Sequence, residues 1–192
     1  MGLSVDLRGA VAVVTGASAG IGEVTSVLLA REGAAVVLAA RRMERLEAIA
    51  RAIERRGGRA LPVPLDVADA DRIARLPAVV EAAFGRCDVL VNNAGVPGGG
   101  RFADASPEEI EQVVRVNLLG VMLCTKALLP LLARDGGGHV VNVGSLAGRF
   151  AAPGASVYSA TKHGVVAFSE ALFHELAPRG VLVTAVNPGF VR

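Results

Sequence analysis

Aromatic and lysine side chains are scarce in this sequence of 192 residues, which contains no tryptophan, one tyrosine and two lysines. Aromatic residues make up only 4% of the chain, so few rings are available to stack on nucleic-acid bases. The net charge is +2, and the basic residues are scattered among acidic ones. These features argue against nucleic acid as the main partner, because such a protein needs a basic patch.

Metal ligands and long apolar runs are also scarce. The two cysteines, Cys87 and Cys124, lack the spacing of metal ligands, and the three histidines form no H-E-x-x-H pattern. We therefore expect no metal site, and we expect both thiols to be buried in a reducing compartment. Without an evident signal peptide or an uninterrupted apolar run of membrane-spanning length, we expect a cytoplasmic protein with no membrane partner.

Apolar residues, in contrast, are abundant and regularly placed. They make up 52% of the chain, against 20% charged residues, which is the composition of a core-forming protein. The length suits a single domain, which we expect to span residues 1–192.

Short β-branched runs alternate with longer stretches suited to helices. The runs predict six strands, at residues 11–15, 35–40, 59–65, 87–91, 139–143 and 181–186. The intervening stretches predict helices at residues 23–32, 43–56, 69–84, 106–134 and 156–177. This alternation predicts an α/β fold, in which a doubly wound parallel sheet lies between two helical layers.

A glycine-rich turn follows the first predicted strand. The segment GASAGIG, at residues 16–22, places Gly16, Gly20 and Gly22 between a strand and a helix. Glycines permit a tight turn and a close approach to a diphosphate, whose charge then meets the free N–H groups of the helix. Such glycines can be purely structural, but the strand–turn–helix order favours a dinucleotide-binding site.

The end of the second predicted strand bears on which dinucleotide is bound. No acidic residue stands at Ala39 or Ala40 to receive the 2′-hydroxyl of NAD, and Arg41 and Arg42 follow directly. The arginines could simply face water at the start of the next helix, but guanidinium groups suit a 2′-phosphate. We therefore expect NADP(H) rather than NAD(H), with Arg41 as the main contact.

Two further strand ends carry small or polar residues. Asp66 and Val67 follow the third strand, where the carboxylate either bonds an adenine edge or caps the next helix. The segment NNAG, at residues 92–95, follows the fourth strand and suits contact with a flat ligand, although it also forms ordinary turns.

The long helix that follows begins with a capping-box pattern, Ser106-Pro107-Glu108-Glu109. Asn117 lies in its apolar interior, where an amide is costly unless it is hydrogen-bonded. We expect Asn117 to hold a backbone distortion or a water, and Pro130 to kink the helix or end its regular part.

The last third of the chain contains the residues best suited to acid–base chemistry. Ser145 follows the fifth strand, and Ser156 can cap the helix that carries Tyr158 and Lys162. The i, i+4 spacing places the phenol and the ammonium on one helix face, one turn apart. A nearby ammonium favours the charged form of a phenol, which helps it to give and take a proton near neutral pH.

Together these motifs resemble, in order and spacing, the short-chain dehydrogenase/reductases, whose fold is Rossmann-like. The matching elements cover essentially the whole chain: TGASAGIG at 15–22, DV at 66–67, NNAG at 92–95, Asn117, Ser145, YSATK at 158–162 and NPG at 187–189.

The resemblance implies a catalytic role for four residues. Tyr158 would be the general acid in carbonyl reduction and the base in alcohol oxidation, and Lys162 would stabilise its charged form and bond the nicotinamide ribose. Ser145 would hold the substrate oxygen, and Asn117 would position a water that links Lys162 to solvent.

The resemblance also implies a set of cofactor contacts along the carboxyl edge of the sheet. These residues are Gly16, Ser18, Gly20, Ile21, Gly22, Arg41, Arg42, Asp66, Val67, Asn93, Ala94, Gly95, Tyr158, Lys162, Pro188 and Gly189.

Three departures from the family pattern stand out. Gly144 occupies a position where many relatives have a second serine, and Ala19 one where many NADP-dependent relatives have a basic residue. The chain also ends soon after NPG, whereas family members continue through a substrate-covering loop and a seventh strand. We therefore expect a domain truncated at its C-terminus, without that strand and lid.

The resemblance implies an NADP(H)-dependent oxidoreductase that acts on a carbonyl or secondary alcohol, as a homodimer or homotetramer when the full-length chain is present. The alternative is a dinucleotide-binding protein without turnover, because the segment that closes the substrate pocket is missing.

Overall fold

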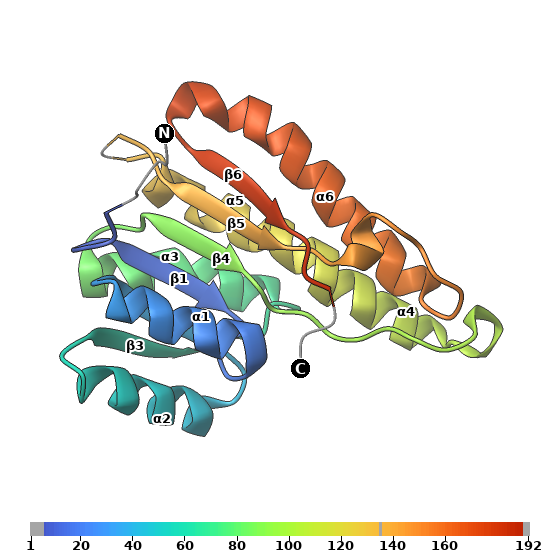
Figure 1. Ribbon diagram of the computed structural model, residues 1–192, viewed down its shortest axis with the longest axis horizontal. Coiled ribbons are helices and arrows are strands. Elements are labelled where there is room, and N and C mark those ends of the chain that lie inside the picture. Colours follow the sequence, from blue (N-terminus) through green and yellow to red (C-terminus); the bar gives the residue numbers. More distant parts are fainter. Residues whose placement is uncertain (1–5, 135, 190–192) are drawn as a thin grey trace.

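The computed structural model describes residues 6–134 and 136–189, and within them six parallel strands form one sheet (Figure 1). The strands are β1 (Val11–Thr15), β2 (Ala35–Ala40), β3 (Arg59–Pro64), β4 (Val89–Asn92), β5 (His139–Val143) and β6 (Leu182–Val186). Their order in the sheet is β3-β2-β1-β4-β5-β6, so the winding direction reverses between β1 and β4. The predicted doubly wound parallel sheet is therefore confirmed.

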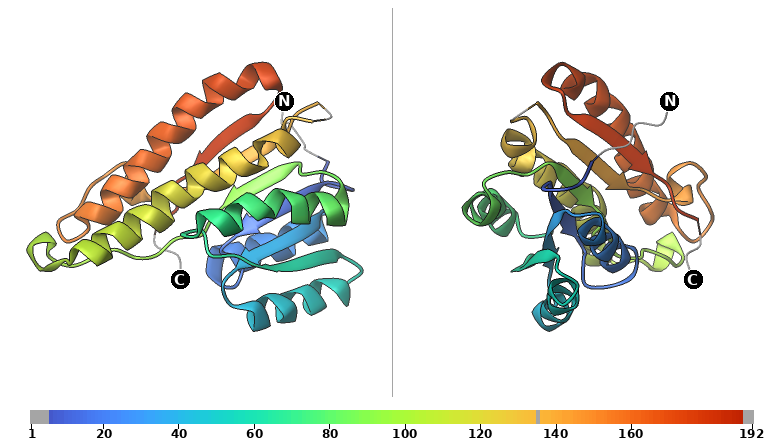
Figure 2. Two further views of the ribbon diagram at one scale, coloured as in Figure 1. Left: turned by 180° about the vertical axis from the view of Figure 1, so that it is seen from behind. Right: turned by 60° about the vertical axis from the view of Figure 1, so that its left-hand side comes forward.

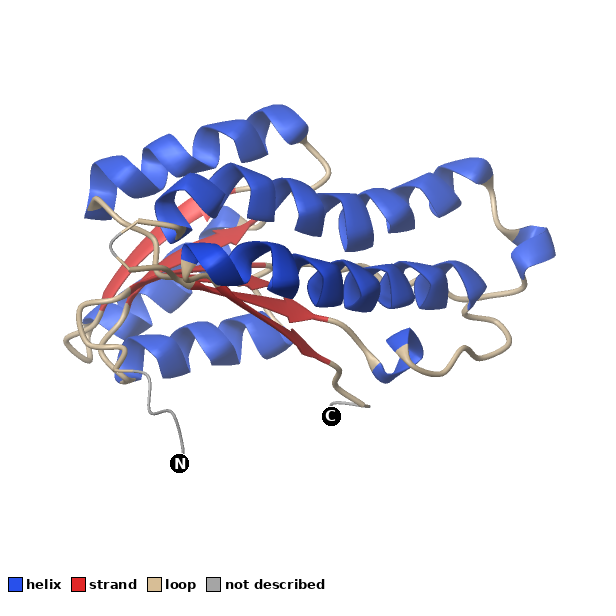
Figure 3. Ribbon diagram, turned by 90° about the horizontal axis from the view of Figure 1, so that it is seen from above, coloured by secondary structure: helices blue, strands red, loops and turns tan. Residues whose placement is uncertain are grey.

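Helices cover both faces of the sheet (Figure 2, Figure 3). They are α1 (Gly20–Arg31), α2 (Met43–Glu54), α3 (Ala70–Phe84), α4 (Pro107–Val114), α5 (Gly120–Leu132) and α6 (Ser156–Leu176). Residues of α1 and α2 belong to the core on one face, and residues of α3, α5 and α6 to the core on the other. The three predicted layers are thus present.

Strand β1 shows why its sequence is apolar throughout. Val11 and Val13 belong to one core cluster, and Ala12 and Val14 belong to the cluster on the opposite face. Because successive strand residues point to opposite faces, a strand covered on both sides needs an unbroken apolar run.

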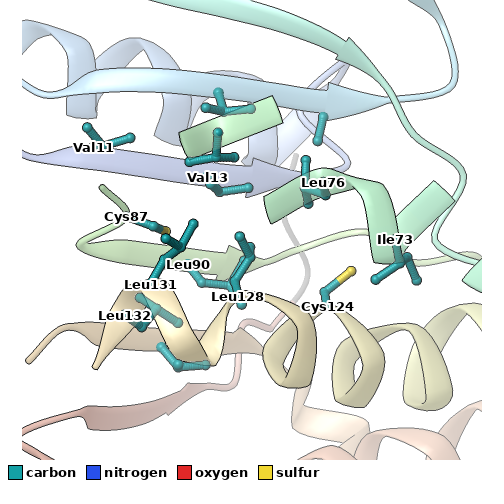
Figure 4. Packing of buried hydrophobic residues seen from close by; sticks show 14 of the residues in the cluster. Val11, Val13, Ile73, Leu76, Cys87, Leu90, Cys124, Leu128, Leu131 and Leu132 are labelled. Carbon is teal, nitrogen blue, oxygen red and sulfur yellow. The ribbon is translucent and has the colours of Figure 1, made fainter. Parts of the chain in front are cut away.

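The larger cluster contains both cysteines, as Figure 4 shows. Cys87 and Cys124 are buried and unpaired, and burial raises the pKa of each thiol to about 12. The expectation of buried thiols is therefore confirmed, and both side chains act as small apolar groups.

Several predicted boundaries are wrong by a few residues. Helix α1 starts at Gly20, inside the glycine turn, and β4 starts at Val89 rather than at residue 87. Next to the start of β4, the Asp88 carboxylate accepts a hydrogen bond from the Val11 N–H, at 2.8 Å, and pairs with Arg86. The predicted Ser156 cap is also wrong, because the cap of α6 is Ala155, which makes no side-chain cap bond.

The long helix after β4 is continuous but irregular. Its capping box is confirmed, with Ser106 Oγ accepting from the Glu109 N–H at 3.2 Å. A π-helical segment, Arg115–Leu119, interrupts it at Asn117, which confirms the expected backbone distortion. Pro130 does not end the regular part, since α5 continues to Leu132.

The helical stretch Pro107–Leu132 is long and apolar enough to cross a membrane, since an 18-residue window within it reaches a mean hydropathy of 1.5. Much of its apolar surface has another explanation, because Cys124, Leu128, Leu131 and Leu132 pack in the core against the sheet. A buried core helix meets the same criterion of length and composition.

Candidate active site

Two adjoining hollows lie where the carboxyl ends of the strands meet, on either side of the reversal between β1 and β4. The first, of about 330 Å³, is lined by most of the predicted cofactor contacts: Gly16, Ser18, Ile21, Arg41, Arg42, Asp66, Val67, Asn93, Ala94 and Gly95. The second, of about 490 Å³, is lined by Ser145, Tyr158, Lys162, Pro188 and Gly189. Ile21, Asn93, Gly95 and Val96 line both, so the two hollows form one continuous site.

Hydrogen bonds join the glycine turn to the segment that follows β4. Thr15 Oγ1 accepts hydrogen bonds from the N–H groups of Asn93 and Ala94, at 3.0 and 3.1 Å. Asn93 Nδ2 in turn donates to the carbonyl oxygens of Thr15 and Gly16, at 2.9 and 3.3 Å. The Asn93 amide therefore fixes the shape of the glycine turn through these hydrogen bonds, and it also lines both hollows.

Two of the turn's glycines are required by this brace. A Cβ at Gly16 would lie 2.8 Å from the Cα of Ala94, and Gly16 also has a φ of +67°. A Cβ at Gly22 would lie 2.4 Å from Asn93 Nδ2 and 2.5 Å from the Gly16 carbonyl oxygen. Gly20 differs, since a Cβ there would meet nothing within 4 Å.

This contrast yields a first prediction. Gly22→Ala is expected to lower the free energy of unfolding by about 1–3 kcal/mol, because the turn must move away from Asn93. It is also expected to weaken cofactor binding at least about tenfold, since a 1 Å displacement of a positioning group has large effects. Gly20→Ala is the matched control, whose cost is confined to the strain of a left-handed φ, about 1–2 kcal/mol.

Urea unfolding and cofactor titration of both variants check this prediction. Equal losses of affinity in the two variants would show that the brace between Gly22 and Asn93 does not shape the binding site.

The two arginines after β2 both line the first hollow, but they differ in their hydrogen bonds. Arg42 donates through Nε and Nη2 to Ser18 Oγ, at 3.2 and 3.0 Å, which joins it to the glycine turn. Arg41 is exposed and lines the same hollow. The expectation that Arg41 is the main contact stays a prediction.

Asp66 shapes the loop after β3. Its Oδ1 accepts a hydrogen bond from the Ala68 N–H at 2.9 Å, and the residue lines the first hollow. The alternative that Asp66 caps the next helix is wrong, because the cap of α3 is Asp69, which accepts from the Arg72 N–H at 3.0 Å.

Tyr158 and Lys162 lie one turn apart on α6, as their spacing predicts. Lys162 Nζ is 5.7 Å from the centroid of the Tyr158 ring and donates to the Val143 carbonyl oxygen at 2.8 Å. Lys162 is 5% exposed, and burial lowers its pKa to about 8. Ser145 lines the same hollow from the end of β5, where its Oγ accepts from the Ala147 N–H at 3.1 Å.

Asn117 lines neither hollow, but its side chain is hydrogen-bonded to the loop that connects β4 to α4. Its Oδ1 accepts from the Val96 N–H at 2.8 Å, and its Nδ2 donates to the Val96 carbonyl oxygen at 2.9 Å. These bonds satisfy a side chain that is fully buried. The proposed water link to Lys162 stays a prediction, and the amide is already occupied.

A buried polar network beneath the site was not predicted from the sequence. Asn92 Nδ2 donates to Thr125 Oγ1 and to Asn142 Oδ1, and Asn142 Nδ2 donates to Ser169 Oγ, each at 2.9 Å. The network joins α5, β4, β5 and α6 directly next to Val143, the residue that holds Lys162. The signal for it is a pair of asparagines within otherwise apolar strands.

The structure explains why position 144 is a glycine. A Cβ there would lie 2.2 Å from Asn187 Oδ1, a buried oxygen that has no hydrogen-bond partner among the described residues. The amide of Asn187 therefore fills the space that a second serine would need.

The residues described offer no group of three or more His, Cys, Asp or Glu side chains that could hold a metal ion.

Known proteins are similar to this chain in both sequence and fold. A family model described as short chain dehydrogenase matches residues 10–192. A 3-oxoacyl-[acyl-carrier-protein] reductase from Synechocystis sp. is 41% identical over 186 residues, which are 96% of this chain and 75% of that protein.

Two solved structures illustrate the likeness in three dimensions. A metagenomic short-chain oxidoreductase in complex with NADP is 42% identical, with a TM-score of 0.91 over 98% of this chain and 86% of that one. A short-chain dehydrogenase/reductase from Burkholderia phymatum in complex with NAD is 32% identical, with a TM-score of 0.94 over 98% of this chain and 68% of that one.

Proposed function

The chain belongs to the short-chain dehydrogenase/reductase family, and we propose that it is an NADP(H)-dependent oxidoreductase acting on a carbonyl or secondary alcohol. The observation that carries this proposal is the hollow shared by Ser145, Tyr158 and Lys162. It adjoins the first hollow, which the glycine turn and the two arginines after β2 line. A dinucleotide fits this arrangement, because Ser18, Ala19 and Ile21 line the first hollow at the start of α1, where the free N–H groups of a helix suit a diphosphate.

In carbonyl reduction, Ser145 Oγ and the Tyr158 hydroxyl would hold the substrate oxygen, and Tyr158 would donate its proton to that oxygen. The ammonium of Lys162, held by the Val143 carbonyl, would stabilise the phenolate that remains. The bound cofactor would supply the hydride that reaches the carbonyl carbon. In alcohol oxidation, Tyr158 would accept the proton instead.

The preference for NADP(H) is supported by charge at the end of β2. Neither Ala39 nor Ala40 supplies a carboxylate there, while Arg41 and Arg42 both line the first hollow. The bonds to Ser18 hold the Arg42 guanidinium beside the glycine turn, so little side-chain entropy is lost when it pairs with a phosphate.

Removal of either arginine is expected to weaken NADPH binding selectively. Arg42→Ala and Arg41→Ala should each raise the Kd for NADPH about 10–100-fold, the value of one charged hydrogen bond, and leave the Kd for NADH nearly unchanged. Arg45→Ala is the control, since Arg45 is an exposed residue on the next turn of α2 that does not line the hollow. Nicotinamide fluorescence measures each Kd.

Comparable losses for NADPH and NADH, or a wild-type preference for NADH, would overturn the proposed cofactor while leaving the oxidoreductase assignment in place.

A further inference from the structure

A short turn directly after Ser145 packs against α6. The turn is a 3-10 segment, Leu146–Gly148, and it ends in a buried glycine. The Gly148 N–H donates to the Ser145 carbonyl oxygen at 2.8 Å, and Ser145 Oγ accepts from the Ala147 N–H at 3.1 Å. These two bonds fix the position of Gly148 relative to Ser145, so a displacement of one displaces the other.

On its other side, Gly148 touches the main chain of Lys162. A Cβ at Gly148 would lie 2.7 Å from the Lys162 carbonyl oxygen, 2.9 Å from its carbonyl carbon and 3.3 Å from its Cβ. Cβ atoms do not pack within 3.0 Å of main-chain atoms, so a side chain here would push the turn and the helix apart. The φ of Gly148 lies outside the left-handed region, so space rather than backbone conformation requires this glycine.

Two hydrogen bonds hold the same face of α6 against β5. Lys162 Nζ donates to the Val143 carbonyl oxygen at 2.8 Å, and Asn142 Nδ2 donates to Ser169 Oγ at 2.9 Å. Ser169 follows Lys162 by seven residues, which places both on one face of the helix. Asn142 and Ser169 are buried, so a shift of α6 away from β5 would leave polar atoms unpaired. Gly148 therefore touches a part of α6 that is anchored to the sheet.

We infer that Gly148 is a positioning residue, which sets the separation between Ser145 and α6 through its contact with the Lys162 main chain. This inference rests on the proposed function, in which the hydroxyls of Ser145 and Tyr158 hold the same substrate oxygen. Both hydroxyls can bond one oxygen only if each lies within about 2.5–3.0 Å of it. Because α6 is anchored, a side chain at Gly148 would move the turn, and Ser145 with it, out of this range.

Gly148→Ala tests the inference with methyl 4-acetylbenzoate as the ketone and NADPH as the reductant. We expect kcat to fall at least about tenfold, since a displacement of 1 Å can cost about 10²-fold in rate. KM should change less, because the interaction that is lost belongs mainly to the transition state.

Gly164→Ala, on the same helix, is the matched control. A Cβ at Gly164 would lie 3.0 Å from Leu118 Cδ1, and its nearest neighbours all belong to this one side chain, which can rotate away. This variant should leave kcat nearly unchanged. Equal losses of kcat in the two glycine variants would overturn the inference.

A double-mutant cycle with Ser145→Ala separates positioning from a general loss of stability. Ser145→Ala alone should lower kcat about 10²–10³-fold, the value of one hydrogen-bond donor to the substrate oxygen. In that background Gly148→Ala should lower kcat by less than about threefold more, because the hydroxyl that it displaces is already absent. Fully additive losses would overturn the inference, since the effect of Gly148 would then not pass through Ser145.

Ser169→Ala is the second test, and it decides the matter if Gly148→Ala fails to fold and to bind NADPH. It removes an anchor of α6 without introducing a clash, so kcat should fall several-fold. Ser169→Thr keeps the hydroxyl that accepts from Asn142 and should restore most of the activity. An unchanged kcat in Ser169→Ala would contradict the inference.

The wild-type protein separates this inference from the proposed function. If it binds NADPH but reduces no ketone, the proposed function fails and the inference fails with it. If it reduces the ketone and Gly148→Ala does so equally well, the proposed function stands and the inference alone is wrong.

Discussion

Replacement of Tyr158 by phenylalanine is expected to lower kcat about 10²–10⁴-fold, the usual contribution of a general acid or base. The phenol is the only tyrosine hydroxyl in the chain, and it lies with Ser145 at the hollow that adjoins the cofactor site. No other described acid lines that hollow apart from the Lys162 ammonium, which is already bonded to Val143. A water that replaces the phenol would be poorly oriented, so little activity should remain.

The control for this variant is cofactor binding. Tyr158→Phe keeps the aromatic ring beside the Lys162 ammonium, so the Kd for NADPH should change less than about threefold, under 1 kcal/mol. A Tyr158→Phe protein that retained full turnover would exclude Tyr158 as the acid and would sink the assigned mechanism.

Replacement of Lys162 by methionine is expected to lower kcat and, at the same time, to raise the free energy of unfolding. In the proposed mechanism the ammonium stabilises the Tyr158 phenolate, so kcat should fall about 10²–10⁴-fold when it is removed. Methionine has a similar length and no charge to desolvate, and Lys162 is 5% exposed. The variant should therefore be more stable to unfolding than the wild type at pH 7.

The pH dependence of that gain follows from the direction of the pKa shift. Burial lowers the pKa of Lys162 from 10.5 to about 8, so between these values the unfolded chain binds a proton that the folded protein has released. Wild-type stability therefore rises with pH across this window, and the full cost of the buried charge, about 3 kcal/mol, applies below pH 8. The advantage of Lys162→Met should be largest near pH 7 and shrink as the pH approaches 10.5.

Urea unfolding of both proteins at pH 7, 8, 9 and 10 measures this difference. An advantage that stays constant with pH, or that grows above pH 8, would mean that the Lys162 ammonium carries no net cost in the folded protein.

Much of the fold could be predicted because each element has a local signal. Strands β1, β2 and β5 have the predicted bounds, since each is a β-branched or apolar run between turn residues. The errors fall at the ends of elements, which local patterns specify least. The start of β4 is one, and beside it the Asp88 carboxylate accepts a hydrogen bond from the backbone of Val11, 77 residues away, a contact that no local pattern predicts.

The edge at which the site forms could also be predicted, because parallel strands bring their carboxyl ends together. The positions of Ser145 and Lys162 at one hollow follow from the end of β5 and from the i, i+4 spacing on α6. Their surroundings could not be predicted. The bond between Thr15 and Asn93 and the network around Asn142 join segments far apart in the chain, and no local pattern specifies such pairs.

Transfer of deuterium tests the central claim most directly. The enzyme would be incubated with methyl 4-acetylbenzoate and NADPH that carries deuterium at C4 of the nicotinamide, and the alcohol would be analysed by mass spectrometry. The account predicts one deuterium on the carbinol carbon for each NADPH oxidised, and loss of this product in Tyr158→Phe. NADPH binding without any labelled alcohol, from this or other ketones, would contradict it and would identify a dinucleotide-binding protein without turnover.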